Sequence, residues 1–260
     1  MKKVALLGAL LACMSGMVSA ELIELDMSTW QTDGDGNWTY NADENSWYQS
    51  VNGQPTVLYD PNQSSINSAI SGTISVVTES DDDFIGFTLG YNQGEVLQGA
   101  GSDFWLVDWK KGEQGGAPAG LALTHVTEGQ SSWSKATDSY NVVARGNTLG
   151  STGWVSYTDY TFDILYDKNL IEVFINDSLE MSVTAQDAGV SEFGDGAFGF
   201  YNFSQSNVVY SDPFLSPTED VVSEEGKEKL STAVPEPSGL ALAGLGIAGM
   251  GFMRRKRSKK

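Results

Sequence analysis

The chain has 260 residues, with 34 acidic residues against 15 lysine and arginine residues, one histidine and one cysteine. Eight of the 15 basic residues lie in the first three and the last seven positions, so the stretch between them is strongly acidic. Because nucleic-acid binding depends on basic side chains that neutralise phosphates, this composition excludes a nucleic-acid-binding role. A strongly acidic surface is instead typical of soluble proteins that attract divalent cations.

The first 20 residues have the parts of a secretory signal peptide: two lysines near the start, an apolar run over 4–12, and small residues at 18–20. A lipoprotein signal is the alternative, because the segment before Cys13 resembles a lipobox. Cleavage after Ala20 would remove the chain's one cysteine. The exported protein would then have no disulfide, and its stability would depend on its core or on a metal.

Residues 21–212 are predicted to form one all-β domain. Within three segments apolar residues recur at every second position, which places each set on one face of a sheet. These sets are Ile85, Phe87, Leu89 and Tyr91, then Tyr160, Phe162, Ile164 and Tyr166, then Ile171, Val173 and Ile175. The polar segments 167–169 and 176–178 are typical of hairpin turns. The pattern predicts an antiparallel two-sheet jelly-roll sandwich.

Residues 213–233 are rich in acids and have no aromatic residue after Phe214. We expect this segment to be a flexible linker, because it can bury little apolar surface.

The segment 234–260 begins with Val234, Pro235, Glu236 and Pro237, continues with uncharged residues, and ends in a basic cluster. In this order the three parts resemble the PEP-CTERM sorting signal of Gram-negative bacteria. The resemblance implies an exosortase-type membrane enzyme that processes the tail, transient anchoring in the inner membrane by a short transmembrane stretch, and a secreted or cell-surface location. An ordinary single-pass anchor is the alternative.

Three adjacent carboxylates, Asp81, Asp82 and Asp83, precede the apolar run that begins at Phe84. Carboxylates in a row repel one another, and Ca²⁺ relieves that repulsion because it takes six to eight oxygen ligands. If the segment is extended, alternation places at most two of the three side chains on one side. A calcium site would then combine Asp81 with Asp83, or it would use Asp82 together with backbone carbonyls and a neighbouring loop. The residues alone fit a calcium site and a solvated acidic strand entrance equally well.

The segment 33–37 is a second acidic candidate, since its oxygen-bearing residues alternate with glycine. It matches an EF-hand loop at Glu44, but Trp38 stands where that loop requires glycine. We therefore interpret it as a turn.

Several segments together, in order and approximate spacing, resemble the C-terminal domain of thrombospondins. The segments are 81–91, 103–110, 153–160, 171–173 and 196–205. The resemblance implies a concanavalin-like, lectin-like jelly roll, calcium binding at Asp81, Asp82 and Asp83, and a role in extracellular adhesion. The chain lacks the Asp-rich repeats and EGF-like modules of those proteins, so their receptors and matrix partners are not carried over.

We predict that the chain is not an enzyme. A glycosidase needs two carboxylates in an aromatic-lined cleft, whereas alternation directs both Glu172 and Glu180 outward. His125 is predicted to be an ordinary strand residue. The aromatic residues considered for stacking on sugar rings, although core positions are more typical, are Trp105, Trp109, Trp133, Trp154 and Tyr157.

The sequence thus predicts an exported, surface-sorted, calcium-binding protein of adhesion or of the extracellular matrix, with glycans and exopolysaccharide among its expected ligands. Its partner would be an extracellular polysaccharide or a matrix protein. The alternatives are a glycan-processing hydrolase on the same fold and a purely structural component of a biofilm matrix.

Overall fold

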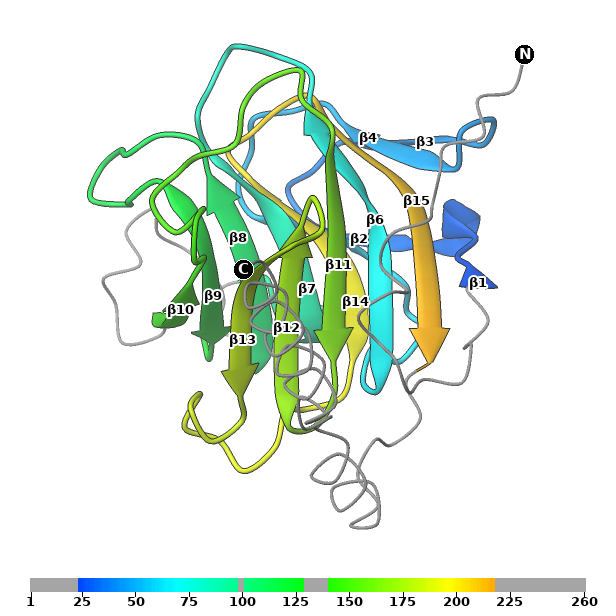
Figure 1. Cartoon of the computed structure of the whole chain (residues 1–260). Coiled ribbons are helices and arrows are strands. Elements are labelled where there is room, and N and C mark those ends of the chain that lie inside the picture. Colours follow the sequence, from blue (N-terminus) through cyan, green and yellow to red (C-terminus); the bar gives the residue numbers. More distant parts are fainter. Residues whose placement is uncertain (1–22, 98–100, 129–139, 218–260) are drawn as a thin grey trace, which may run out of the picture. The chain divides into compact units, whose positions relative to one another are not determined.

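The computed structural model describes residues 23–97, 101–128 and 140–217 (Figure 1). This part of the chain is built from β-strands and one turn of 3-10 helix, and no helix in it is long and apolar enough to cross a membrane. The elements are β1 (Ile23–Glu24), η2 (Met27–Thr29), β2 (Gln31–Gly34), β3 (Trp38–Asn41), β4 (Ser46–Gln49), β5 (Thr56–Tyr59), β6 (Ser68–Val76), β7 (Phe84–Tyr91), β8 (Phe104–Lys110), β9 (Gly120–Val126), β10 (Tyr140–Arg145), β11 (Tyr160–Tyr166), β12 (Leu170–Ile175), β13 (Ser178–Thr184), β14 (Ala197–Phe203) and β15 (Val208–Pro217).

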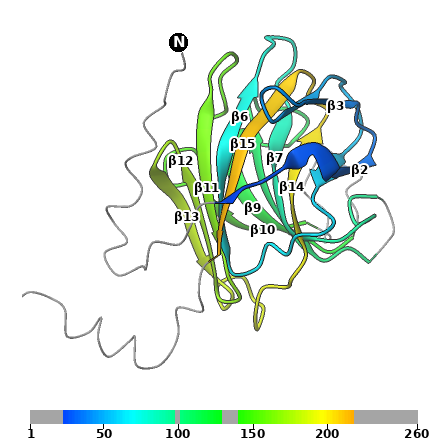
Figure 2. The same ribbon diagram turned by 90° about the vertical axis from the view of Figure 1, so that its right-hand side faces the viewer.

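The strands form two antiparallel sheets that lie in two layers (Figures 1 and 2). The first sheet has the order β13-β12-β11-β6-β15-β4-β3, with β1 paired to β15. The second sheet has the order β10-β9-β8-β7-β14-β5-β2. Neighbours in each sheet are often far apart in sequence, as a jelly roll requires. The predicted all-β, two-sheet sandwich is confirmed.

The main core lies between the sheets. Because side chains alternate along a strand, β7 contributes Ile85, Phe87 and Leu89 to it, and β11 contributes Phe162 among others. The rings of Phe87 and Phe162 are 4.3 Å apart, centroid to centroid. The predicted faces of β11 and β12 are confirmed by the same core.

Tyr91 was predicted to share the face of Ile85, and this is wrong. Thr88 pairs with Gly199 while Tyr91 pairs with Ala197, so β7 contains a bulge between these points. Gly90 lies in the bulge with a φ of +66°, which glycine adopts without a steric penalty. The bulge turns Tyr91 to the opposite face of the second sheet.

The outer face of the second sheet is also apolar, and we call its buried residues the outer cluster. They are Val57, Tyr59, Phe84, Tyr91, Val96, Phe104, Leu106, Ala117, Val126, Ala197, Tyr201 and Phe203. Every residue of β7, β8 and β14 is buried as a result. Strands buried on both faces are typically continuous apolar runs.

Both predicted hairpin turns are present, between β11 and β12 and between β12 and β13. In the second turn Asn176 and Asp177 have positive φ angles of 50° and 62°, as a two-residue hairpin favours. The predicted linker begins too early, because β15 continues to Pro217 and pairs Leu215 with Ile70 of β6. The predicted signal peptide, the rest of the predicted linker and the sorting segment lie outside the described residues.

Asp163 on β11 is a partly buried carboxyl group whose pKa is raised in the folded protein. Its carboxylate accepts no hydrogen bond from the described residues, and burial, reinforced by Asp177, raises its pKa to about 6 from the ordinary 3.8. Folding is therefore disfavoured when this carboxylate is charged, and the penalty disappears as the pH falls through 6 towards 3.8.

We expect Asp163→Asn to raise the Tm at pH 7.5 by about 2–4 °C, which corresponds to about 1 kcal/mol in a domain of this size. At pH 4 the two proteins should melt together, and Asp43→Asn, at an exposed position, should leave the Tm unchanged at both pH values. A lower Tm for Asp163→Asn at pH 7.5 would contradict this account.

Candidate functional site

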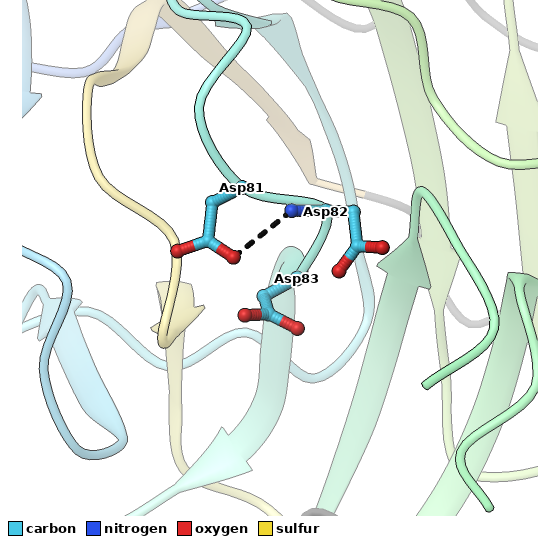
Figure 3. A group of neighbouring side chains, drawn as sticks. All are labelled: Asp81, Asp82 and Asp83. Atoms are coloured by element: carbon cyan, nitrogen blue, oxygen red, sulfur yellow. Dashed lines mark hydrogen bonds between the residues drawn. The ribbon is translucent and has the colours of Figure 1, made fainter. Parts of the chain in front are cut away.

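Asp81, Asp82 and Asp83 lie in the loop that leads into β7 (Figure 3). One carboxylate oxygen from each residue can be chosen so that all three lie within 4.8 Å of one another. Asp81 and Asp82 are partly exposed, whereas Asp83 is buried. We call these three residues the acidic cluster.

The cluster does not follow the alternation expected of a strand. Asp81 has a φ of +93°, and the backbone NH of Asp82 donates a hydrogen bond to Oδ1 of Asp81 at 3.1 Å (Figure 3). The chain therefore turns at Asp81 and becomes extended only at Phe84. This turn brings three side chains together where an extended segment would allow two.

Lys110, at the end of β8, is the basic residue of this site. Its side chain is fully buried, and its ammonium group lies 2.6 Å from Oδ1 of Asp83 and 3.4 Å from Oδ1 of Asp82. It also donates to the backbone carbonyl of Asp82 at 3.0 Å and lies over the ring of Phe84, 5.1 Å from its centroid. A buried charge is tolerated only when it is paired and hydrogen-bonded, and the acidic cluster supplies both.

Lys110 is not among the predicted site residues, although the sequence contains a signal for it. In the antiparallel pairing of β7 with β8, Lys110 is the partner of Phe84. The apolar runs that begin at Phe84 and Phe104 can be paired as antiparallel strands. Choosing the register that puts the acidic cluster next to the nearest basic residue would have identified Lys110.

Other segments converge on Asp83. Its backbone NH donates to Oε1 of Gln205 at 3.1 Å, and its carbonyl accepts from the indole NH of Trp154 at 2.9 Å. Asp81 accepts a hydrogen bond from the side-chain amide of Asn52. Segments before β5, before β11 and after β14 thus hold the loop in place.

The pKa of Asp83 is raised to about 7, mainly by burial and also by Asp81, although the hydrogen bond from Lys110 acts to lower it. Desolvation disfavours the charged form of a carboxyl group, and a neighbouring carboxylate does the same. One ammonium group therefore does not neutralise this cluster fully.

The donor set fits a hard cation. The three oxygens lie within 4.8 Å of one another, which is close to the spacing of ligand atoms around one Ca²⁺ ion, whose ligands lie about 2.3–2.6 Å away. Lys110 contacts the carboxylates of Asp82 and Asp83 through Oδ1 of each, so Oδ2 of each carboxylate could serve as a ligand. Asp81, Asp82 and Asp83 are the residues that would hold such an ion.

Asp33, in the second acidic segment, has a structural role. Its Oδ2 accepts hydrogen bonds from the hydroxyl of Tyr91 at 2.9 Å and from the backbone NH of Gly94 at 2.6 Å. These bonds fix the loop that follows β7. The interpretation of this segment as a turn agrees with β2 ending at Gly34.

Glu172 and Glu180 were both predicted to point outward, and for Glu180 this is wrong. In the pairing of β12 with β13, Val173 faces Met181 and Phe174 faces Leu179, so Glu180 is the extra residue of a bulge. Its buried carboxylate accepts from the backbone NH groups of Thr148 and Leu149 at 2.9 and 3.0 Å. It pins the loop after β10 to the edge of the first sheet.

The aromatic candidates for sugar stacking differ in their exposure. Trp105, Trp109 and Trp154 are buried, and Trp133 lies outside the described residues. Tyr157 is 65% exposed and stays available. His125 is on β9 as predicted, where it stacks on Trp105 and lies 2.7 Å from Asp103.

Residues 33–216 match the family model of the thrombospondin C-terminal region. The chain belongs to the thrombospondin C-terminal region family. Thrombospondin-2 of Gallus gallus is 25% identical over 198 residues, and thrombospondin-2 of Homo sapiens is 23% identical over the same length. The match covers 68% of this chain and 16% of each relative, so the chain spans a small part of the length of these proteins.

Solved structures show the same lectin-like fold in other proteins. A carbohydrate-binding module, CBM66, from Bacillus subtilis superposes with a TM-score of 0.54 at 11% identity and covers 74% of this chain and 97% of its own. The exoplasmic/lumenal domain of VIP36, in its Ca²⁺/Man3GlcNAc-bound form, has a TM-score of 0.51 at 10% identity and covers 79% of this chain and 92% of its own. At these identities the likeness establishes the jelly-roll fold.

Residues 233–257 match the PEP-CTERM protein-sorting motif, which confirms the resemblance seen in the sequence. The motif marks this member of the thrombospondin C-terminal region family as an exported, surface-sorted protein. Its motif residues, Val234, Pro235, Glu236 and Pro237, and the predicted transmembrane stretch lie outside the described residues.

Lys110→Met tests the buried ion pair. The substitution keeps the apolar stem but removes the ammonium group, which leaves the buried carboxylate of Asp83 without its cation. We expect it to lower the free energy of unfolding by about 3–5 kcal/mol, as measured by urea denaturation. Lys168→Met, at an exposed turn, is the matched control and should change stability little. A loss below about 1 kcal/mol for Lys110→Met would show that the pair contributes no net stability.

Proposed function

We propose that this chain is an exported, calcium-binding adhesion protein of the extracellular matrix, and that it acts by binding and not by catalysis. The observation that carries the proposal is the acidic cluster, in which three carboxylates lie together and only two of them pair with one buried ammonium group. Calcium would complete the neutralisation of Asp81, Asp82 and Asp83 and would fix the loop before β7 as part of a binding surface.

Charge supports a second cation at this site. Lys110 pairs with Asp82 and Asp83 through Oδ1 of each, and Asp81 adds a third carboxylate to the cluster. A divalent ion balances the excess negative charge, and the chain as a whole is acidic enough to attract one. Membership of the thrombospondin family and the calcium-bound form of VIP36, which shares the fold, agree with this choice of ion.

The fold supports an extracellular polysaccharide or matrix protein as the partner, since CBM66 is a carbohydrate-binding module. The sorting motif supports processing by an exosortase-type enzyme, with the tail in the membrane before processing. Glu180 does not support the hydrolase alternative, because its carboxylate is buried and already accepts hydrogen bonds from the loop after β10.

Thermal melting of the full chain in calcium and in chelator tests the metal. Free calcium at 100 times its Kd should stabilise the protein by about 2.7 kcal/mol. In a domain of this size that raises the Tm by roughly 5–10 °C.

Asp82→Asn should abolish most of the calcium-dependent rise, because it removes one charged ligand from a partly exposed position. Asp43→Asn removes one negative charge at an exposed site elsewhere and should keep the full rise. If the wild-type Tm is the same in calcium and in chelator, the calcium proposal fails and the structural-matrix alternative gains.

A further inference from the structure

A polar pocket of about 330 Å³ opens where three loops meet beside the second sheet. Its walls come from the loop after β5, the loop after β7 and the loop before β14. The residues that line it are Tyr59, Pro61, Asn62, Gln63, Ser64, Tyr91, Asn92, Gln93, Asp195, Gly196 and Ala197. The pocket includes none of the acidic cluster.

Ser65 holds the three walls together. This fully buried residue donates hydrogen bonds to the carbonyl of Gly196 from both its backbone NH and its hydroxyl, each at 2.8 Å. Its hydroxyl also accepts from the backbone NH of Gly90 at 3.3 Å. The pocket is therefore formed before any ligand arrives, which reduces the entropy lost on binding.

Close backbone packing fixes the same junction. A Cβ atom on Gly196 would lie 2.4 Å from the backbone carbon of Gly90 and 2.8 Å from the nitrogen of Tyr91. Only glycine allows the loop before β14 to approach β7 so closely. The bulge at Gly90 then directs Tyr91 to the side where the pocket lies.

The chemistry of the lining is that of a site for a neutral, hydroxyl-rich ligand. Among the described residues, no lysine, arginine or histidine lines the pocket, which disfavours anionic ligands. Asp195 uses one oxygen, Oδ1, to accept from the hydroxyl of Ser64 at 2.6 Å and from the NH of Gly196 at 2.7 Å. Its Oδ2 accepts no hydrogen bond from the described residues, so a carboxylate oxygen remains for hydroxyl donors.

The amides of Asn62 and Gln93 are uncommitted, since neither side chain makes a hydrogen bond within the described part of the chain. Tyr59 gives an independent sign of an incomplete site. It is 2% exposed, and its hydroxyl has no hydrogen-bond partner among the described residues. A buried polar atom without a partner is unfavourable, and a bound water or a ligand atom would satisfy it.

We propose that this pocket binds one neutral sugar residue of an extracellular glycan. Its volume lies at the lower end of the range for small-molecule sites, as a single residue needs. In this proposal the carboxylate of Asp195 accepts hydrogen bonds from sugar hydroxyls. The amides of Asn62 and Gln93 donate hydrogen bonds to the sugar and accept them from it. Tyr59 and Tyr91 form the apolar wall of the pocket. The inference deepens the proposed binding function by naming its ligand class, but it does not depend on calcium at the acidic cluster.

The test is a titration of the full chain with the methyl glycosides of glucose, galactose, mannose and N-acetylglucosamine, in which binding is detected by saturation-transfer NMR. At least one glycoside should bind. The double variant Asn62→Ala/Gln93→Ala should weaken that binding roughly tenfold or more, because each lost hydrogen bond is worth about 1 kcal/mol. Its Tm should equal that of the wild type, since neither side chain supports the fold.

Gln186→Ala removes an equally exposed amide outside the pocket and should bind as the wild type does. Undiminished binding by the double variant would overturn the pocket as the site while leaving glycan binding by the protein intact. Absence of binding by all four glycosides would overturn the sugar proposal. Neither result would alter the calcium-dependent melting that tests the proposed function.

Discussion

The burial of the Lys110 ammonium group is the constraint around which one end of this sandwich is organised. A charge in that position must be paired, so the carboxylate of Asp83 has to lie within hydrogen-bonding distance of it. The backbone of Asp83 is in turn held by Gln205, which follows β14, and by Trp154, which precedes β11. One ion pair thus links the start of β7 to the end of β8, and its carboxylate residue links both to segments that lead into the first sheet.

The same constraint explains why the proposed function centres on the acidic cluster. Lys110 satisfies one oxygen of Asp82 and one of Asp83, while the backbone turn at Asp81, with its positive φ angle, brings a third carboxylate to the cluster. Pairing the buried ammonium group of Lys110 would require only one of these three carboxylates. A second cation would balance the additional negative charge, which is why the proposed function adds calcium.

Much of the fold could be predicted from alternation alone. Phe87 and Phe162 were assigned to core faces because apolar residues at every second position share one side of a strand. The failures fall at bulges, where an extra residue reverses the alternation: Tyr91 beyond Gly90, and Glu180 opposite Val173 and Phe174. A bulge depends on pairing with a strand elsewhere in the sequence, so the local pattern cannot reveal it.

The sites show the same division. Asp81, Asp82 and Asp83 were visible as a run, but their convergence depends on a backbone turn, and Lys110 depends on the pairing of β7 with β8. The polar pocket was not predictable, because Asn62, Gln93 and Asp195 are distant in sequence and meet only through Ser65 and a close approach of two glycines. Loops that converge in space carry no periodic signal.

The central claim is that the acidic cluster holds a divalent ion as well as the ammonium group of Lys110. A crystal structure of the protein grown with calcium tests it most directly. We predict an ion about 2.3–2.6 Å from oxygens of Asp81, Asp82 and Asp83, with Lys110 still paired to Asp83. An ordered cluster that contains only Lys110 as its cation, at saturating calcium, would contradict the account.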